Sequence, residues 1–217
     1  MDDGSLSRLV AAPGAGDGRA GLAAATAYAA RAAGSCTVIL VEGLSDQAAL
    51  LTLAARQGRD LGEDGAFVVP MGGATNIGHF LDLFGPRGFG VALAGLCDEA
   101  EEGDFRRGLE RAGLGYRLTR AGLEQLGFYV CVADLEDELI RSLGAEAVER
   151  LIEAEGELGP FRTFCQQPAQ RGRTRVQQLR RFLGTRSGRK IRYGQVLAGA
   201  VDLGQVPRPL SGVLSRV

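Results

Sequence analysis

The stretch that decides the fold of this chain, residues 37–46, reads Thr-Val-Ile-Leu-Val-Glu-Gly-Leu-Ser-Asp. Its first five residues are apolar or β-branched, which predicts a buried parallel strand that runs into Glu42. Gly43 then permits a turn, and Ser45 is placed to cap a helix that begins with Asp46. Ligands of open α/β sheets bind at the carboxyl edge of the strands. Glu42 and Asp46 therefore put an acidic corner where strand packing needs none.

Two later apolar strands, predicted over 91–97 and 128–133, also run into acidic residues. The first is followed by Asp98, Glu99, Glu101 and Glu102, and the second by Asp134, Glu136, Asp137 and Glu138. The helix dipole explains one or two acids at each helix start, but not why three strands all end this way at one edge. Hard divalent cations take carboxylate oxygens. The strand ends therefore predict a divalent-metal site.

Strands and helices alternate through the first two thirds of the chain. We predict strands over 37–42, 66–71, 91–97 and 128–133, and helices near 46–57, 75–84, 102–112 and 136–155. This order is typical of an α/β fold, in which a parallel sheet of about four strands is flanked by helices.

Three regions follow from this pattern. They are an Ala/Gly-rich, partly mobile extension over 1–35 with a helix near 19–33, an α/β domain over 36–157, and a basic C-terminal segment over 158–217. The C-terminal segment is expected to be mostly helical and to pack on the α/β domain. Its best candidate helices span 174–184 and 190–201.

The composition excludes several classes of protein. The chain has 217 residues, of which 45% are hydrophobic, and no apolar run approaches the ~20 residues that cross a bilayer. The first residues include Asp2 and Asp3 and show no signal-peptide core, so we expect a cytoplasmic protein without a membrane partner. Its four cysteines form no Cys-x-x-Cys pair, which argues against a structural zinc. There is also no P-loop and no Gly-x-Gly-x-x-Gly fingerprint.

The net charge of −1 hides a basic segment. No acid lies between Glu157 and Asp202, where ten of the 25 basic residues fall. A basic segment beside an acidic site suits a polyanion held across metal ions, and a solvated basic face is the alternative. The candidate nucleic-acid contacts are Arg171, Arg173, Arg175, Arg180, Arg181, Arg186, Arg189 and Arg192.

Lys190 is the one lysine in a chain with 24 arginines. A lysine ammonium is a compact point charge that can also give up a proton, whereas the arginine guanidinium is a fixed fork that stays protonated. Lys190 would suit the stabilisation of a phosphorane-like charge or the protonation of a leaving oxygen. The alternative is that Lys190 lies on a solvated surface and was retained there by chance.

The acidic motifs at the strand ends resemble those of a known domain family. Val41-Glu42-Gly43-x-x-Asp46, followed by an apolar strand that ends at Asp98, resembles the Toprim domain of primases, topoisomerases, recombination-mediator proteins and small nucleases. The resemblance covers about residues 36–140. With Asp134-x-Glu136, the chain is closer to the overcoming-lysogenisation-defect (OLD) nucleases than to topoisomerases. OLD proteins also use a lysine in a C-terminal segment similar to residues 188–193, Gly-Arg-Lys-Ile-Arg-Tyr, and the whole chain resembles stand-alone actinobacterial Toprim proteins.

The resemblance implies a Toprim fold and a Mg²⁺- or Mn²⁺-dependent endonuclease that acts on DNA or RNA, with Glu42 and Lys190 as catalytic residues. It implies the metal ligands Glu42, Asp46, Asp98, Asp134 and Glu136, with Glu101 or Glu102 as a further oxygen donor. That donor is needed because the usual Toprim Asp-x-Asp would end at position 100, where this chain has Ala100. The sequence therefore leaves open whether the site binds one metal ion or two.

Two alternatives accompany this interpretation. The first is a ribosomal-RNA-maturing Toprim ribonuclease, and the second is a catalytically weak nucleic-acid-binding or regulatory subunit, which Ala100 favours. OLD nucleases carry an ATPase domain ahead of the Toprim module, and nothing in this chain matches one. We therefore expect either a separate ATPase or other protein partner, or a protein that works without ATP. The oligomeric state stays open.

Overall fold

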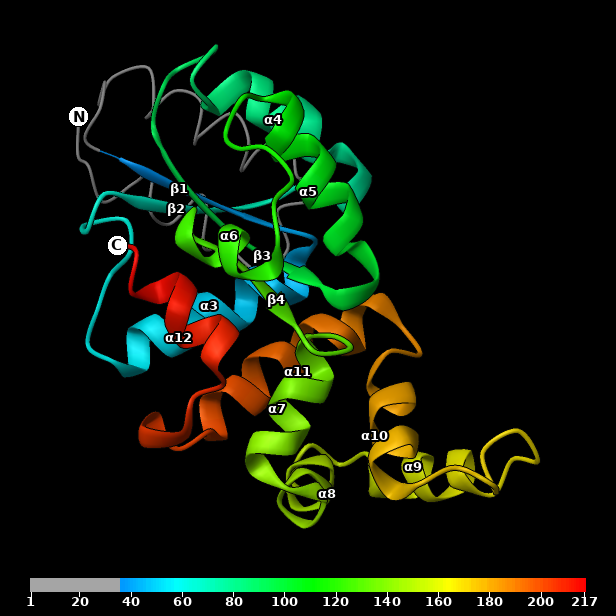
Figure 1. Ribbon diagram of the computed structural model, residues 1–217. Helices are drawn as coiled ribbons and strands as arrows, with labels where there is room; N and C mark the ends of the chain where they lie inside the picture. Colours follow the sequence, from blue (N-terminus) through cyan, green and yellow to red (C-terminus); the bar gives the residue numbers. More distant parts are fainter. Residues whose placement is uncertain (1–35) are drawn as a thin grey trace.

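The structure is a computed structural model that describes residues 36–217, so the extension over 1–35 and its predicted helix near 19–33 lie outside the described residues. Four strands form one parallel sheet in the order β2-β1-β3-β4 (Figure 1). Their bounds are β1 Thr37–Val41, β2 Ala66–Pro70, β3 Ala92–Asp98 and β4 Phe128–Cys131. The prediction of an α/β fold with a four-stranded parallel sheet is confirmed.

Helices cover both faces of this sheet (Figure 1). One face carries α4 (Ile77–Phe84), α5 (Glu102–Arg111) and α6 (Arg120–Gln125). The other carries α3 (Leu44–Arg56), α7 (Leu135–Leu143), α11 (Ser187–Ala200) and α12 (Arg208–Leu214). Side chains of β1 alternate between the two cores, because neighbouring residues of a strand point to opposite faces. Val38 and Leu40 enter the first core, and Ile39 and Val41 enter the second.

Three further helices extend the second face away from the sheet (Figure 1). They are α8 (Ala145–Ala154), α9 (Leu158–Cys165) and α10 (Arg175–Leu183), and α10 packs against α7. Short 3₁₀ turns η1 (Ala74–Asn76), η2 (Glu99–Glu101) and η3 (Leu203–Gln205) complete the described elements. Leu179, Tyr193 and Leu210 from the C-terminal segment are buried in the same core as Ile39. No helix among residues 36–217 combines the length and apolar character needed to cross a bilayer.

The structure corrects two local predictions. Gly43, not Ser45, precedes α3, and the N–H of Gly43 donates to Asp46 Oδ2 at 2.9 Å. Ser45 is buried inside the helix instead. The single long helix predicted over 136–155 is two helices, α7 and α8, because Gly144 breaks it with a φ of +80°. A positive φ costs glycine little and ends a helix.

Helix α11 lies directly against α3, and Gly194 permits the close approach. A Cβ at position 194 would lie 2.7 Å from the backbone oxygen of Ser45. Lys190 precedes Gly194 by one turn of the same helix. The small residue therefore determines how close the start of α11 lies to the carboxyl edge of β1.

Gly194→Ala should lower the free energy of unfolding by about 1–2 kcal/mol, because overpacking against backbone exceeds the ~1 kcal/mol gain in helix propensity. Gly199→Ala is the matched control on the same helix, since its new methyl group would meet Thr52 Cγ2 at an ordinary 3.9 Å. The control should be neutral or stabilised by up to about 1 kcal/mol. Urea denaturation of both variants checks this, and equal stabilities would contradict the close α3–α11 contact.

Candidate metal centre and nucleic-acid interface

The carboxyl ends of β1 and β3 bring two acids to one edge of the sheet. The strands are hydrogen-bonded neighbours, and Glu42 and Asp98 stand at their ends. The backbone of Glu42 is held in place by the turn after β2, because its carbonyl oxygen accepts the N–H groups of Gly72 at 3.0 Å and Gly73 at 3.1 Å. This edge is where ligands of open α/β sheets bind.

Glu101, from the turn η2, completes a group of three that we call the acidic cluster: Glu42, Asp98 and Glu101. One carboxylate oxygen of each lies within 4.8 Å of the others, and all three side chains are half-buried. No other group of His, Cys, Asp or Glu side chains in residues 36–217 offers three ligand atoms this close. Glu101 Oε2 is buried and finds no hydrogen-bond partner among the described residues. A buried, unpartnered carboxylate oxygen among other carboxylates fits a hard cation.

Asp46 lies next to the acidic cluster on the first turn of α3 and is only 6% exposed. Its Oδ2 accepts the N–H of Gly43, which closes the turn between β1 and α3. Burial raises the pKa of Asp46 to about 6. The hydrogen bond from Gly43 and the charge of Lys190 act in the opposite direction. Asp46 thus supports the turn that presents Glu42 and adds negative charge behind the cluster.

The turn between β4 and α7 contains a strained residue, Ala133, whose φ is +66°. A non-glycine residue pays about 1–2 kcal/mol for this conformation. Two side chains hold the turn: Glu138 Oε1 accepts the N–H of Val132 at 2.7 Å, and Asp134 Oδ1 accepts the N–H of Asp137 at 2.8 Å. Asp134 therefore caps α7 at the same edge of the sheet.

Asp134 and Glu136 face cations from the C-terminal segment. Arg180 Nε on α10 donates to Asp134 Oδ2 at 2.5 Å. Lys190 Nζ on α11 lies 3.6 Å from Glu136 Oε2. Glu136 is 3% exposed, and its other oxygen finds no partner among the described residues. Asp134 and Glu136 thus contact basic side chains. Glu42, Asp98 and Glu101 instead lie close to one another.

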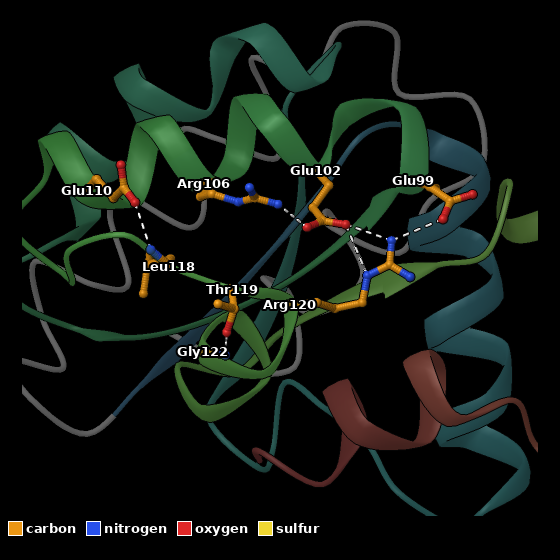
Figure 2. Close-up of polar contacts among 8 residues, drawn as sticks. All are labelled: Glu99, Glu102, Arg106, Glu110, Leu118, Thr119, Arg120 and Gly122. Atoms are coloured by element: carbon orange, nitrogen blue, oxygen red, sulfur yellow. Dashed lines mark hydrogen bonds and ion pairs between the residues drawn. The ribbon is translucent and has the colours of Figure 1, made fainter.

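Glu102 lies outside the acidic cluster. Its carboxylate pairs with Arg106 and, at 2.6 Å, with Arg120, which also bonds Glu99 at 3.1 Å (Figure 2). Burial alone would raise the pKa of Glu102, but these guanidinium groups outweigh it and lower the pKa. The i,i+4 spacing of Glu102 and Arg106 was a signal for this ion pair in the sequence. Glu101 therefore belongs to the candidate metal site, and Glu102 belongs to an ion-pair network beside it.

The electrostatics of the site reflect crowded, buried carboxylates. Burial, followed by the charges of Asp46 and Glu42, raises the pKa of Asp98 to about 8. Burial and the contact with Glu42 raise the pKa of Glu101 to about 7. Burial raises the pKa of Glu136 to about 7. Negative charge held this closely favours a bound cation.

The metal-free protein should lose stability as the pH rises from about 4 to about 8. Carboxyl groups titrate near pH 4 when unfolded, whereas Asp46, Glu101 and Asp98 have pKa values of about 6, 7 and 8 in the folded protein. The folded state therefore binds protons in this window that the unfolded state does not, which lowers the free energy of unfolding with rising pH. Thermal melts in EDTA at pH 5.5 and 8.0 check this, and added Mn²⁺ should restore the midpoint at pH 8.0. A higher midpoint at pH 8.0 without metal would contradict the crowded cluster.

A basic groove adjoins Asp134 at this edge of the sheet. The groove has a volume of about 530 Å³ and is lined by Asp134, Phe164, Arg173, Gln177, Arg180, Arg181, Gly184 and Thr185. Asp134 belongs to both the groove and the sheet edge, and Arg180 on α10 lines the groove and pairs with Asp134, so the groove reaches the sheet edge at Asp134. Phe164 was absent from the predicted site, because nothing in its local sequence indicates which cavity it lines.

The eight predicted nucleic-acid contacts differ in what they touch, and Arg180 pairs with Asp134. Arg175, Arg189 and Arg192 form ion pairs with Glu149, Glu157 and Glu155. Arg171 and Arg173 donate to backbone oxygens, and Arg181 and Arg186 are exposed. Arg173, Arg180 and Arg181 line the groove, and Arg186 lines a smaller pocket of about 230 Å³ with Gly188, Arg189 and Arg192.

Comparison with known proteins shows what this chain is similar to. Residues 35–99 match the family model of the Toprim domain of overcoming lysogenization defect protein-like proteins. No curated protein matches the chain. The C-terminal region of the Xanthomonas campestris pv. campestris OLD protein, phased with platinum, is 25% identical, with a TM-score of 0.64, and the match covers 84% of this chain and 92% of that chain.

A second solved structure extends the structural similarity to another organism. The C-terminal region of the Burkholderia pseudomallei OLD protein is 22% identical, with a TM-score of 0.62 over 82% of this chain and 95% of that one. At this identity the likeness shows the fold alone. Together with the family model, these findings confirm the predicted resemblance to the Toprim module of OLD proteins.

Proposed function

We propose that this protein, which carries an OLD-like Toprim domain, is a divalent-metal-dependent nuclease that hydrolyses phosphodiester bonds in DNA or RNA. One observation carries the proposal: three half-buried carboxylates lie within 4.8 Å of one another at the edge of the sheet. A lysine and an arginine-lined groove beside them add the charge that a phosphate backbone requires.

Glu42, Asp98 and Glu101 would hold Mg²⁺ or Mn²⁺. The bound ion would supply Lewis-acid stabilisation of charge on the phosphate oxygens. Glu42, at the end of β1, could also accept a proton from the attacking water. Asp46 would support this group from behind through its bond to Gly43.

Lys190 would stabilise charge on the reacting phosphate. Burial alone would lower the pKa of its ammonium group, but Glu136, Asp46 and Asp98 outweigh burial and raise the pKa. A group with a raised pKa stays charged at neutral pH and is a poor proton donor, since efficient general acids titrate near the working pH. Of the two roles open to Lys190, the structure therefore supports charge stabilisation over proton transfer.

A cleavage panel tests the proposal. Plasmid DNA, single-stranded DNA and structured RNA are each incubated with the protein and Mn²⁺ or Mg²⁺, with and without ATP, and parallel reactions contain EDTA. Cleavage that requires the ion supports a nuclease. Cleavage of structured RNA alone would favour the RNA-maturing alternative.

A second candidate function is a binding or regulatory subunit that needs a partner. The observation that favours it is the engagement of Asp134 and Glu136 by Arg180 and Lys190, together with Ala100 where a Toprim aspartate is usual. Tight nucleic-acid binding with no cleavage under any condition of the panel would favour this function.

The groove would hold the phosphate backbone, so Arg173→Ala with Arg181→Ala should weaken binding of every sequence alike. Each lost phosphate contact removes a slope of about 0.7–0.9 from the dependence of log K on log salt. Fluorescence anisotropy at several salt concentrations measures both effects. Arg111→Ala with Arg117→Ala is the control, because it removes the same charge at exposed positions outside the groove. Equal weakening by both double variants would show nonspecific attraction and no path through the groove.

A further inference from the structure

The predicted metal ligands separate by the charge of their neighbours. Glu42, Asp98 and Glu101 approach one another, and Glu101 Oε2 has no hydrogen-bond partner among the described residues. Asp134 and Glu136 instead approach Arg180 and Lys190. A site for two ions would need oxygen donors on both sides of the reacting phosphate.

Asp134 already uses both of its oxygens. Oδ1 accepts the N–H of Asp137 at the start of α7, and Oδ2 accepts Nε of Arg180. The first bond is the N-terminal cap of α7, so turning the carboxylate toward an ion would uncap the helix. The strained turn at Ala133 fixes the backbone from which Asp134 projects.

Glu136 is the charge partner of Lys190. Its side chain is 3% exposed, so its charged form is stabilised chiefly by the ammonium group 3.6 Å away. Lys190 in turn lies in the first turn of α11, and Gly194 lets this helix pack closely against α3. Position 100, where a further donor would stand, is an alanine and offers no side-chain oxygen.

We propose that this chain binds one divalent ion, at Glu42, Asp98 and Glu101, and that Arg180 and Lys190 take the place of a second ion. The inference rests on the proposed function, because it concerns the same metal site. Arg180 and Lys190 each carry a positive charge beside the acidic cluster, and a second dication between them would be repelled by both. A phosphate that enters from the groove would meet the guanidinium of Arg180 and the ammonium of Lys190 as its second source of positive charge.

Metal stoichiometry tests this inference without any activity assay. Isothermal titration of the full chain with Mn²⁺ should give one ion per chain, and the electron paramagnetic resonance spectrum should be that of an isolated Mn²⁺. Two ions per chain with a spin-coupled spectrum would overturn the inference and leave the proposed nuclease function standing. A chain that binds no Mn²⁺ would overturn both.

Two sets of variants locate the ion. Asp134→Asn with Glu136→Gln should leave one ion per chain and change the Mn²⁺ affinity by less than about tenfold, whereas a larger loss would overturn the inference by making these residues ligands. Arg180→Gln with Lys190→Gln should free both carboxylates and allow a second, weaker ion. Arg181→Gln with Arg186→Gln is the control, which removes the same charge from exposed positions and should leave one ion.

A thermal melt accompanies each variant, so that stoichiometry is compared only between folded proteins. If Arg180→Gln with Lys190→Gln unfolds, the first double variant still decides the question. A folded Arg180→Gln, Lys190→Gln protein that stays at one ion would overturn the assignment of these two cations as replacements for a metal.

Discussion

Asp98→Asn should abolish metal-dependent cleavage and raise the thermal midpoint of the metal-free protein. Asp98 is one of three carboxylates that would hold the ion, and loss of the ion's several kcal/mol of charge stabilisation corresponds to on the order of 10³-fold in rate. The midpoint should rise because burial and the charges of Asp46 and Glu42 raise the pKa of Asp98 to about 8, so its ionised form is unfavourable in the folded state. Each kcal/mol gained corresponds to about 2–4 °C in a chain of this size.

The measurements are cleavage of the preferred substrate in Mn²⁺ and differential scanning calorimetry in EDTA at pH 8.0. Asp82→Asn is the matched control, because Asp82 is exposed on α4, pairs with Arg87 and lies outside the acidic cluster. It should change neither quantity. An Asp98→Asn protein with full activity would favour the binding-subunit function, and a lowered midpoint would contradict charge crowding in the cluster.

Lys190→Ala and Lys190→Arg should both reduce the rate on bound substrate, by about 10²–10³-fold, with little loss of affinity. The reason is that the ammonium group would act mainly on charge that develops in the transition state. Arginine should not replace lysine, because its larger planar fork does not fit the place of a compact point charge opposite a buried carboxylate. Single-turnover kinetics at saturating protein separates the rate from binding.

Lys190 also makes a structural contribution that the same variants should reveal. Glu136 is 3% exposed, and Lys190 is the cation that faces it. Lys190→Ala should therefore lower the melting midpoint more at pH 8.0 than at pH 5.5, where Glu136, with a pKa of about 7, is already protonated. Arg181→Ala, which removes an exposed charge from α10, should show no such pH dependence. Equal losses of binding from Lys190→Ala and Arg181→Ala, with an unchanged rate on bound substrate, would make Lys190 one more backbone contact.

The strands were predictable because their signal is local. Residues 38–41 are buried on both faces of the sheet, and such burial requires a short run of apolar residues. The acids at the ends of the strands were predictable for the same reason. Helix ends were less predictable: Gly144 breaks the predicted helix over 136–155, and Gly43 displaces Ser45 from the start of α3. Both depend on a glycine conformation that the sequence permits but does not require.

The spacing of the acids could not predict which of them join the acidic cluster and which pair with arginines. Glu101 and Glu102 are adjacent in sequence, yet Glu101 lies close to Glu42 and Asp98. Glu102 instead points toward Arg106 and Arg120 (Figure 2). The cause is the 3₁₀ turn η2, after which α5 starts and points Glu102 to its own helix and to α6. A difference of one residue in where the helix begins decides which side chain reaches the cluster.

The sequence by itself therefore determined a parallel sheet whose strands end in acids, and a basic C-terminal segment with one lysine, because apolar periodicity and charge are properties of short stretches. Only the tertiary structure decided which charges meet. Arg180 reaches Asp134 from α10, and Lys190 reaches Glu136 because Gly194 lets α11 approach α3. Coulombic attraction and metal coordination act over a few ångströms, and in this chain that proximity is created by the packing of helices distant in sequence.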